Sequence, residues 1–228
     1  MPDDVAPSPP TAARIVDSVL EALAAGRLPA GTRLREEALA GLFATSRTVV
    51  RDALKELALR GVVALAPNRG AAIAHPSPED AADAYAARAL IEGAMMEDLA
   101  QHVTAADIRR LDAHVAEQKR TLAEGDRRTH LRLMGEFHML LARLHGNATL
   151  ATVLEGMIAR TSLMTALYPP DSQGCAIADH EALVRHLARG EGREARGVAA
   201  HHLLGNRARL RMPARPPVTD LAAVLRTG

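Results

Sequence analysis

Apolar residues recur every three or four positions along most of the chain, which is the spacing expected of amphipathic α-helices. In the first quarter of the sequence this pattern predicts three helices, over residues 11–26, 36–43 and 46–60. Two short apolar runs follow, at 62–65 and 71–74, and a turn sequence lies between them. Such runs predict a small hairpin. We therefore expect residues 11–75 to form one small domain of three helices and a hairpin.

Two prolines, Pro76 and Pro78, then interrupt the pattern and predict a domain boundary, with Ser77 and Pro78 well suited to begin a new helix. Beyond them the pattern stays helical as far as Met212. The expected helices span 78–101, 104–124, 126–146, 148–167, 175–189 and 191–211. The predicted organisation is a flexible leader (1–10), the first domain (11–75), a linker (76–80), a helical bundle (81–212) and a loose tail (213–228). The fold class is therefore mainly α.

Composition agrees with this division and excludes several classes of protein. A chain of 228 residues exceeds the usual size of one domain. Aromatic residues make up only 2 % of it and tryptophan is absent, which argues against a large β-sandwich or barrel. A net charge of +1 is typical neither of a disordered chain nor of a uniformly basic nucleic-acid coat.

The expected compartment is the cytoplasm, without membrane attachment. Cys175 is the lone cysteine, so no disulfide can form within the chain, which fits a reducing compartment, and we expect this thiol to be incidental to function. No apolar run approaches the roughly 18 residues of a membrane span. The amino terminus lacks the basic and apolar regions of a secretory signal.

The third predicted helix has the character of the second helix of a helix–turn–helix. It opens with small polar and basic residues, and Arg47, Arg51 and Lys55 share one face at i, i+4 and i+8 spacing. Between residues 13 and 75 there are nine basic and six acidic residues, an excess of three positive charges. Arginine in such a helix can read guanine edges in the major groove. The alternative is a solvated basic face on a structural helix.

Three segments resemble the GntR family of winged helix–turn–helix regulators. The run Leu28-Pro29-Ala30-Gly31-Thr32-Arg33-Leu34-Arg35-Glu36-Glu37-Ala38-Leu39-Ala40 resembles the opening of that domain, and Ser46-Arg47-Thr48-Val49-Val50-Arg51-Asp52-Ala53-Leu54 resembles its recognition helix. Asn68-Arg69-Gly70 resembles the wing. Val49 departs from the family, since many members have proline there. The DNA contacts that the resemblance implies are Arg35, Ser46, Arg47, Thr48, Arg51, Arg69 and Gly70.

Histidines are concentrated in the second domain, where nine of the ten lie between His102 and His202. His138, His180 and His202 fall on three different predicted helices, and imidazoles from separate helices can converge on a metal ion inside a bundle. Spacing alone leaves open that these histidines have unrelated roles. We expect the side chain of His201 to point away from that of His202. We expect solvated faces for His102, His114, His130, His145 and His186.

This second domain resembles the FCD domain, the ligand-binding half of the FadR subfamily. The resemblance is carried by Glu136-Phe137-His138-Met139-Leu140-Leu141, His145-Gly146-Asn147, Asp179-His180-Glu181-Ala182-Leu183 and the helix around His202. It implies that His138, His180 and His202 hold one divalent metal ion, Zn²⁺ or similar. The fourth ligand in metal-binding members is an aspartate, and Met134 stands at that position here. A thioether is a poor zinc ligand, so occupancy of this site is left open.

These observations predict a ligand-responsive transcriptional regulator and not an enzyme. It would bind double-stranded operator DNA as a homodimer on a near-palindromic site, and a small organic acid would release it, as in a repressor. Arg88 and Arg160 are the expected partners of the effector carboxylate, with ordinary ion pairs as the alternative for each. Two other functions stay open at this point: a metal-dependent all-α hydrolase that uses the three histidines, and a sensor of the metal itself.

Overall fold

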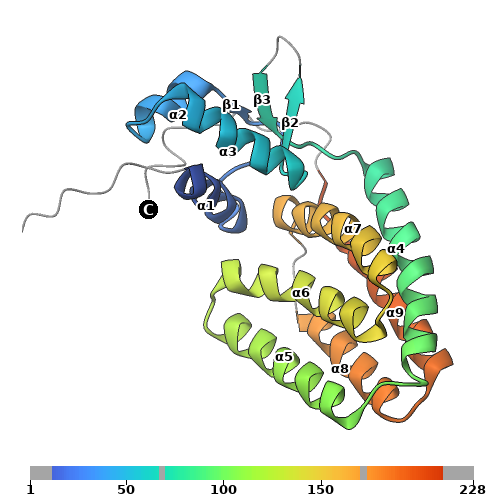
Figure 1. Ribbon diagram of the computed structural model, residues 1–228. Helices are drawn as coiled ribbons and strands as arrows, with labels where there is room; N and C mark the ends of the chain where they lie inside the picture. Colours follow the sequence, from blue (N-terminus) through green and yellow to red (C-terminus); the bar gives the residue numbers. More distant parts are fainter. Residues whose placement is uncertain (1–11, 67–69, 170–173, 213–228) are drawn as a thin grey trace, which may run out of the picture. The chain divides into compact units, whose positions relative to one another are not determined.

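The computed structural model describes residues 12–66, 70–169 and 174–212, and it divides the chain into two compact units (Figure 1). The boundary falls between His75 and Pro76, where the two prolines predict it. The first helix of the second unit already begins at Pro78. Residues 78–80 of the expected linker therefore belong to that helix.

The first unit contains three helices and a three-stranded antiparallel sheet. Its elements are α1 (Ala12–Ala24), β1 (Arg33–Leu34), α2 (Glu36–Leu42), α3 (Arg47–Leu59), β2 (Val63–Ala66) and β3 (Gly70–Ile73). The strand order is β1-β3-β2, so the predicted hairpin is present, with each strand displaced by one residue. β1 was not predicted, because two residues are too short to show an alternating pattern. Ile15, Leu39 and Leu57 are fully buried in this unit.

The turn between α2 and α3 contains a left-handed residue that is not glycine. Ala44 has a φ of 47°, and it follows the capping residue Phe43 at the end of α2. A left-handed backbone brings the Cβ atom close to the following carbonyl and costs about 1–2 kcal/mol. Ala44 thus adopts, in this tight turn, a backbone conformation that alanine disfavours.

Ala44→Gly is therefore expected to stabilise the first unit. Glycine removes the left-handed strain but loses more backbone entropy on folding, which leaves a net gain of about 0.5–1 kcal/mol. Denaturant unfolding of the full chain, followed by circular dichroism, measures this gain. Ala38→Gly, at an exposed position inside α2, is the control and should destabilise. A decrease in stability for Ala44→Gly would contradict the interpretation that Ala44 is strained in the folded protein.

The described part of the second unit consists of helices alone. They are α4 (Pro78–Leu99), α5 (Ala105–Ala123), α6 (Arg127–His145), α7 (Ala148–Leu167), α8 (Gly174–Ala188) and α9 (Gly192–Arg209). Capping explains where three of them begin: Ser77 and Asp80 form a capping box for α4, Thr104 and Asp107 form one for α5, and the side chain of Asn147 caps α7. Every helix starts and ends within two residues of its predicted range.

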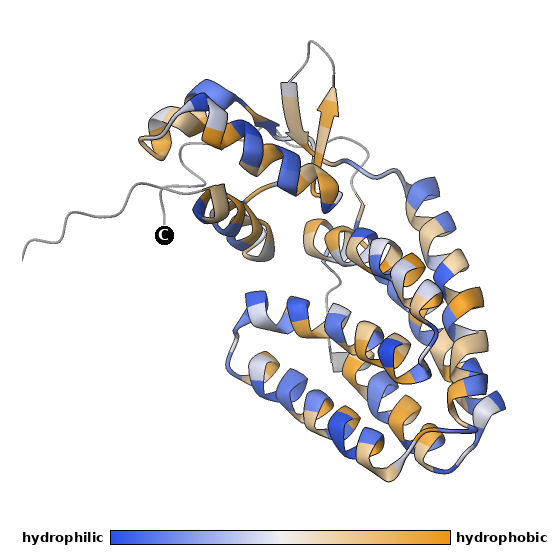
Figure 2. Ribbon diagram, in the orientation of Figure 1, coloured by the Kyte–Doolittle hydropathy of each residue, from blue (hydrophilic) through white to orange (hydrophobic). Residues whose placement is uncertain are grey.

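Each of these helices carries both hydrophilic and hydrophobic residues (Figure 2). One core cluster, which includes Phe137, joins residues from α4 through α9, and a second joins residues of α4, α7 and α9. Helix α7 is long and apolar enough to cross a membrane by length and composition. It also carries Glu155 and Arg160, and its Leu154, Ile158 and Met164 are buried in the bundle. We therefore interpret α7 as a helix of the bundle.

Candidate functional site

The front of α3 presents an exposed polar surface. Ser46 is the N-cap residue, and its hydroxyl accepts a hydrogen bond from the Val49 amide at 3.4 Å. Arg47, Thr48 and Arg51 follow on the first two turns and are exposed. Their exposure among the described residues leaves these side chains accessible to a partner.

The other expected DNA contacts lie at two further places in the first unit. Arg35 is exposed and occupies the N-cap position of α2, without a side-chain cap. Gly70 is exposed at the start of β3, with a φ of 76° that glycine adopts without strain. Arg69 lies outside the described residues.

Acidic residues at the start of α2 hold the arginines of α3, which the sequence did not reveal. The Nε atom of Arg51 donates to both carboxylate oxygens of Glu36 at 2.9 Å, and Arg47 lies 3.9 Å from Glu37. The hydrogen bond from Arg51 lowers the pKa of Glu36. These ion pairs are exposed and therefore weak. A phosphate or a base edge can compete with Glu36 for the exposed side chain of Arg51.

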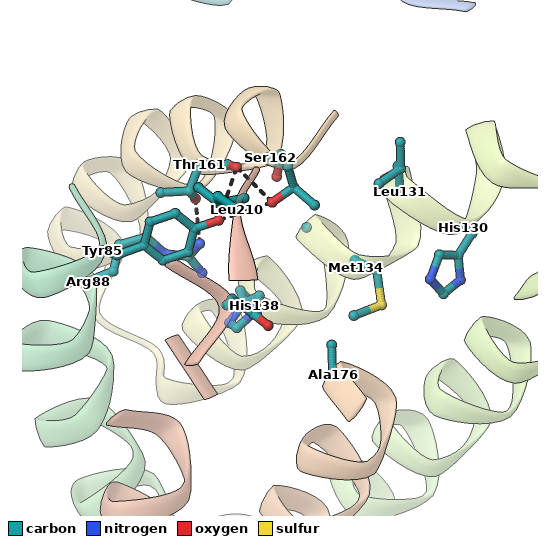
Figure 3. A pocket seen from close by; sticks show the side chains of 13 residues that line it. Tyr85, Arg88, His130, Leu131, Met134, His138, Thr161, Ser162, Ala176 and Leu210 are labelled. Atoms are coloured by element: carbon teal, nitrogen blue, oxygen red, sulfur yellow. Dashed lines mark hydrogen bonds between the residues drawn. The ribbon is translucent and has the colours of Figure 1, made fainter. Parts of the chain in front are cut away.

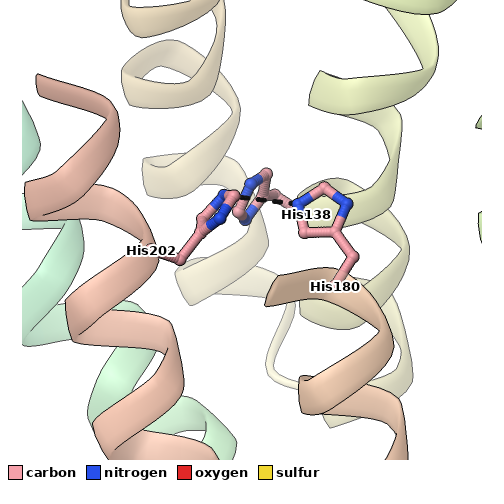
Figure 4. A group of neighbouring side chains, drawn as sticks. All are labelled: His138, His180 and His202. Carbon is pink, nitrogen blue, oxygen red and sulfur yellow. Dashed lines mark hydrogen bonds between the residues drawn. The ribbon is translucent and has the colours of Figure 1, made fainter. Parts of the chain in front are cut away.

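The second unit brings His138, His180 and His202 together (Figure 4). They come from α6, α8 and α9, respectively, and all three are buried. One ring nitrogen from each lies within 4.8 Å of the others, and the Nε2 atoms of His180 and His202 are 3.3 Å apart. The convergence that the sequence suggested is therefore present in the fold. His201, the neighbour of His202, is exposed as expected.

Each of these three histidines is oriented through its other ring nitrogen. The Nδ1 atom of His138 lies 2.7 Å from Glu92, that of His180 lies 2.9 Å from Gln118, and that of His202 lies 3.2 Å from Asp179. The partner atom is an oxygen in every case, and a carboxylate or amide oxygen accepts. Nδ1 therefore carries the proton, and the Nε2 lone pairs face one another, as in metal sites whose histidines are fixed by outer partners.

Burial keeps the three imidazoles neutral. It lowers the pKa of His138 to about 4, and it also lowers the pKa values of His180 and His202. Burial alone would raise the pKa of Glu92, but Arg88 and His138 outweigh it and lower this pKa to about 2. At neutral pH the site thus combines three neutral nitrogen donors with an ionised carboxylate behind them.

This donor set fits a divalent metal ion. Two nitrogens that each lie about 2.0–2.1 Å from a tetrahedral Zn²⁺ are about 3.3 Å apart, which matches the separation of His180 and His202. Met134 lies one helical turn before His138 on α6 and lines the same pocket. No carboxylate from α6 therefore completes the set among the described residues. The Nδ2 atom of Asn206 donates to Nε2 of His202 at 3.0 Å.

A pocket opens beside this cluster (Figure 3). Its polar wall includes Tyr85, Arg88, Thr161 and Asn206, and its apolar wall includes Leu131, Met134, Ala176 and Leu210. His138 is part of both the histidine cluster and the pocket wall. A ligand in this pocket would therefore lie next to the three histidines.

Arg88 is the strongest anchor in the pocket. The residue is 4 % exposed, with Nε donating to Glu92 at 2.6 Å and Nη1 donating to Thr161 Oγ1 at 2.5 Å. The Nη2 atom has no hydrogen-bond partner among the described residues. A buried donor without an acceptor is unfavourable, so this atom points to an anionic oxygen as its missing partner.

Arg160 lies elsewhere. It is half-exposed, donates to Asp80 at 2.7 Å and does not line the pocket. Asp80 belongs to the capping box of α4. The ion-pair alternative of the sequence analysis therefore describes this arginine, and the structure does not bring it to Arg88.

The expectation of solvated faces held for His102, which is exposed, but was wrong for His130, which is buried. Three other histidines are partly buried and have polar partners. His114 accepts from Gln118 at 3.1 Å, His145 lies 2.9 Å from Asp98, and His186 lies 2.7 Å from Glu191. The side chain of Cys175 lies outside what the structure describes.

The stability of the metal-free protein should fall as the pH is lowered from 7.5 to 5. The pKa of His138 is about 4 in the folded chain, whereas its ordinary value of 6.5 applies in the unfolded chain. Between pH 7.5 and 5 the unfolded chain therefore gains a proton at this residue, and the folded chain does not. This residue alone then accounts for a loss of about 2 kcal/mol. His180 and His202 act in the same direction, while Glu92 stays ionised throughout. Denaturant unfolding in the presence of a chelator measures the change, and a stability that is constant or rises toward pH 5 would contradict it.

Comparisons with known proteins agree across both units. A model of the FCD domain matches residues 83–205, and a model described as bacterial regulatory proteins, gntR family, matches residues 11–73. A probable D-xylose utilization operon transcriptional repressor of Paenarthrobacter nicotinovorans is 27 % identical over 195 residues, which cover 84 % of this chain and 85 % of that protein.

Solved structures share the fold. A putative transcriptional regulator GntR from Rhodococcus sp. RHA1 aligns with a TM-score of 0.71 at 22 % identity, over 86 % of this chain and 95 % of that one. McbR/YncC of E. coli aligns with a TM-score of 0.68 at 18 % identity, over the same shares of the two chains. At these identities the alignments establish the architecture and no more.

Proposed function

Because this chain belongs to the GntR family of bacterial regulatory proteins and carries an FCD domain behind its helix–turn–helix, we propose that it is a ligand-controlled repressor of the FadR type. It is a transcriptional regulator, and its relatives are regulators and not enzymes. The finer proposal has three parts: the operator that it reads, the effector that releases it, and the metal ion that assists the effector.

The operator is read by α3, with Arg47 and Arg51 contacting base edges. Ser46, Thr48, Arg35 and the wing at Arg69 and Gly70 contact the backbone around them. One recognition helix covers only a few base pairs, so specific binding requires two copies on a near-palindromic site. The protein therefore acts as a homodimer.

The effector is a small organic acid that binds in the pocket of the second unit. One observation carries this part: Arg88 lines the pocket, and its buried Nη2 atom has no partner in the described chain. Arginine binds carboxylates through two parallel hydrogen bonds. None of the described residues that line the pocket is an aspartate or a glutamate that would repel a carboxylate. Dicarboxylic, hydroxy and simple acids all satisfy this requirement.

A divalent ion held by His138, His180 and His202 would add a second point of attachment. When bound, it supplies a positive charge and an open coordination position for an oxygen ligand. The histidines themselves contribute neutral nitrogen donors, oriented by Glu92, Gln118 and Asp179. Because Met134 adds no charge, the affinity for the ion depends on the acid, and the affinity for the acid depends on the ion.

The hydrolase alternative finds no support in this arrangement. A metal-dependent hydrolase requires a general base whose pKa lies near the working pH. The carboxylate nearest His138 belongs to Glu92, which has a pKa of about 2 and is hydrogen-bonded to both Arg88 and His138. The carboxylate of Glu136 is exposed and accepts hydrogen bonds from Arg132 at 2.6 Å. It is therefore engaged away from the histidine cluster.

Fluorescence anisotropy with the full-length protein tests the proposal. The labelled duplex is the DNA upstream of the protein's own gene, and a shuffled duplex of equal length is the control. We expect specific binding that weakens steeply with salt, and a fall in affinity of about 5–150-fold when the correct acid is added. A panel of dicarboxylic, hydroxy and sugar acids is screened with Zn²⁺ and, separately, with a chelator. Equal affinity for the two duplexes, or release by none of the acids under either condition, would overturn the proposal.

A further inference from the structure

His130 occupies the end of the pocket that is remote from the histidine cluster. It lies on α6, eight residues before His138, and is 1 % exposed. It lines the same pocket as Arg88 (Figure 3). Its Nε2 atom is buried and has no hydrogen-bond partner among the residues that the structure describes. His130 is thus a second residue of the pocket wall, besides Arg88, that has an unsatisfied polar atom.

The hydrogen bonds of His130 determine the role of that atom. Its Nδ1 atom lies 3.2 Å from the backbone carbonyl oxygen of Gln118 and 3.5 Å from the hydroxyl oxygen of Thr121. The hydroxyl of Thr121 donates to backbone carbonyl oxygens of its own helix, so its oxygen can accept from Nδ1. A carbonyl oxygen only accepts hydrogen bonds, so Nδ1 carries the proton. In a neutral imidazole the other nitrogen then offers a lone pair, and burial favours the neutral form. Nε2 of His130 is consequently an acceptor that lacks a donor.

We propose that His130 is a specificity-determining residue, which accepts a hydrogen bond from a hydroxyl group of the effector. This inference rests on the proposed function, because it assumes that an acid binds at Arg88. A hydroxyl suits this end of the pocket better than an ammonium group does, since no carboxylate among the described residues lines the pocket to compensate a positive charge. The effector is therefore a hydroxycarboxylic acid whose hydroxyl is distant from its carboxylate.

The position of His130 on α6 indicates where that hydroxyl lies on the acid. Arg88 and His138 both bind the carboxylate of Glu92, so an acid held by Arg88 has its carboxylate near His138. His130 lies eight residues before His138, which corresponds to about 12 Å along a helix axis. The hydroxyl is therefore expected at the far end of a chain of several carbon atoms. Between the two ends, Leu131, Met134 and Ala176 line the pocket and suit methylene groups.

Calorimetric titration of the full-length protein with matched acids tests the proposal. The probes are 5-hydroxypentanoate and 6-hydroxyhexanoate, each compared with the parent acid that lacks the hydroxyl, in the presence of Zn²⁺. For the wild type we expect at least one hydroxy acid to bind about fivefold more tightly than its parent, the effect of one net hydrogen bond. In His130→Phe this ratio should fall to about one. His102→Phe, an exposed position outside the pocket, should keep the wild-type ratio.

A second measurement uses the wild-type protein alone, so it does not depend on whether a variant folds. Nitrogen NMR of histidine-labelled wild-type protein reports the protonation of each ring nitrogen. We expect His130 to carry its proton on Nδ1, and its Nε2 resonance to shift with the hydroxy acid but not with the parent acid. A proton on Nε2 would overturn the proposal, as would an Nε2 resonance that responds equally to both acids.

The outcomes separate this proposal from the function on which it rests. If the acids bind with no preference for the hydroxyl, or if the preference survives in His130→Phe, the role of His130 is wrong while the carboxylate pocket stands. If none of the four acids binds, the length and class of effector stated here are wrong. Release of the operator is measured in a separate assay, with a broader panel of acids, so it succeeds or fails independently.

Discussion

Replacing both Arg47 and Arg51 with alanine is expected to lower the affinity of the full-length protein for its operator by about 100- to 10,000-fold. Each arginine that reads a base edge contributes about 1–3 kcal/mol of discrimination. Both side chains are on the first two turns of α3 and are more than half exposed, at 61 % and 59 %. Removing them leaves the buried residues of α3 unchanged, so folding should not suffer.

The matched control is Arg60→Ala. Arg60 caps the other end of α3, is half-exposed and pairs with Glu56, so the variant loses a positive charge from the same helix without touching its front. Anisotropy at constant ionic strength, with operator and shuffled duplexes, separates base reading from general attraction to phosphates. We expect the Arg47/Arg51 variant to lose its preference for the operator and Arg60→Ala to keep it. Equal losses in both variants would show that α3 contributes charge alone.

Met134→Asp is expected to raise the affinity for Zn²⁺ by about 100-fold. Met134 precedes His138 by one helical turn and lines the same pocket. An aspartate there adds both an oxygen ligand and a negative charge to three neutral nitrogens. It should also weaken the mutual dependence of metal and effector, because the protein then fills a position that the effector's carboxylate fills in the wild type.

Competition with a chromogenic chelator at pH 7.5 measures this affinity directly. Met134→Asn is the control, since it has the shape of aspartate without the charge, and it should stay near the wild type. The titrations are repeated with each acid of the panel that releases the operator. An affinity that is unchanged in Met134→Asp would mean that position 134 does not face the ion. An acid effect that is equally strong in Met134→Asp would mean that the effector does not coordinate the ion.

Local signals in the sequence determined most of the fold. The limits of α7 follow from the Asn147 cap at one end and the prolines after Tyr168 at the other, so its predicted range of 148–167 is also the observed one. The short strand β1 has no such signal, because pairing with β3 creates it and two residues carry no alternation. The observed limits of β2 and β3 differ by one residue from the predicted ones for the same reason, because neither run alone determines the register between the strands.

The candidate site shows a sharper limit. A resemblance to known sequences identified the three histidines, but not what orients them. Glu92 lies 46 residues before His138, and Gln118 lies 62 residues before His180, so helical periodicity cannot connect either pair. His130, in contrast, could have been recognised as buried. It precedes Leu133, Phe137 and Leu141 at intervals of three, four and four residues, which places it on the buried face of α6.

The spacing of Arg88 and Glu92 can be read from the sequence, but their burial cannot. Their i, i+4 spacing is a common pattern on exposed helix faces, and nothing in the sequence separates such a pair from a buried one. The structure places both side chains inside the bundle, against Thr161 and His138. Packing of α4 against the other helices decides their burial, and that packing is not a property of α4 alone.

Two adjacent residues of α7 form hydrogen bonds with α4 at separate points. Arg160 donates to Asp80 in the first turn of α4, and Thr161 accepts from Arg88 two turns later. The first contact lies five residues from the boundary between the two units, and the second lies in the pocket wall. A change that remodels this stretch of α7 to accommodate a different metabolite therefore also disturbs the segment next to the DNA-binding unit. During the evolution of such regulators, a change in effector specificity is therefore expected to be accompanied by a change in how strongly the effector regulates transcription. A redesign of the pocket should leave Arg160 unchanged.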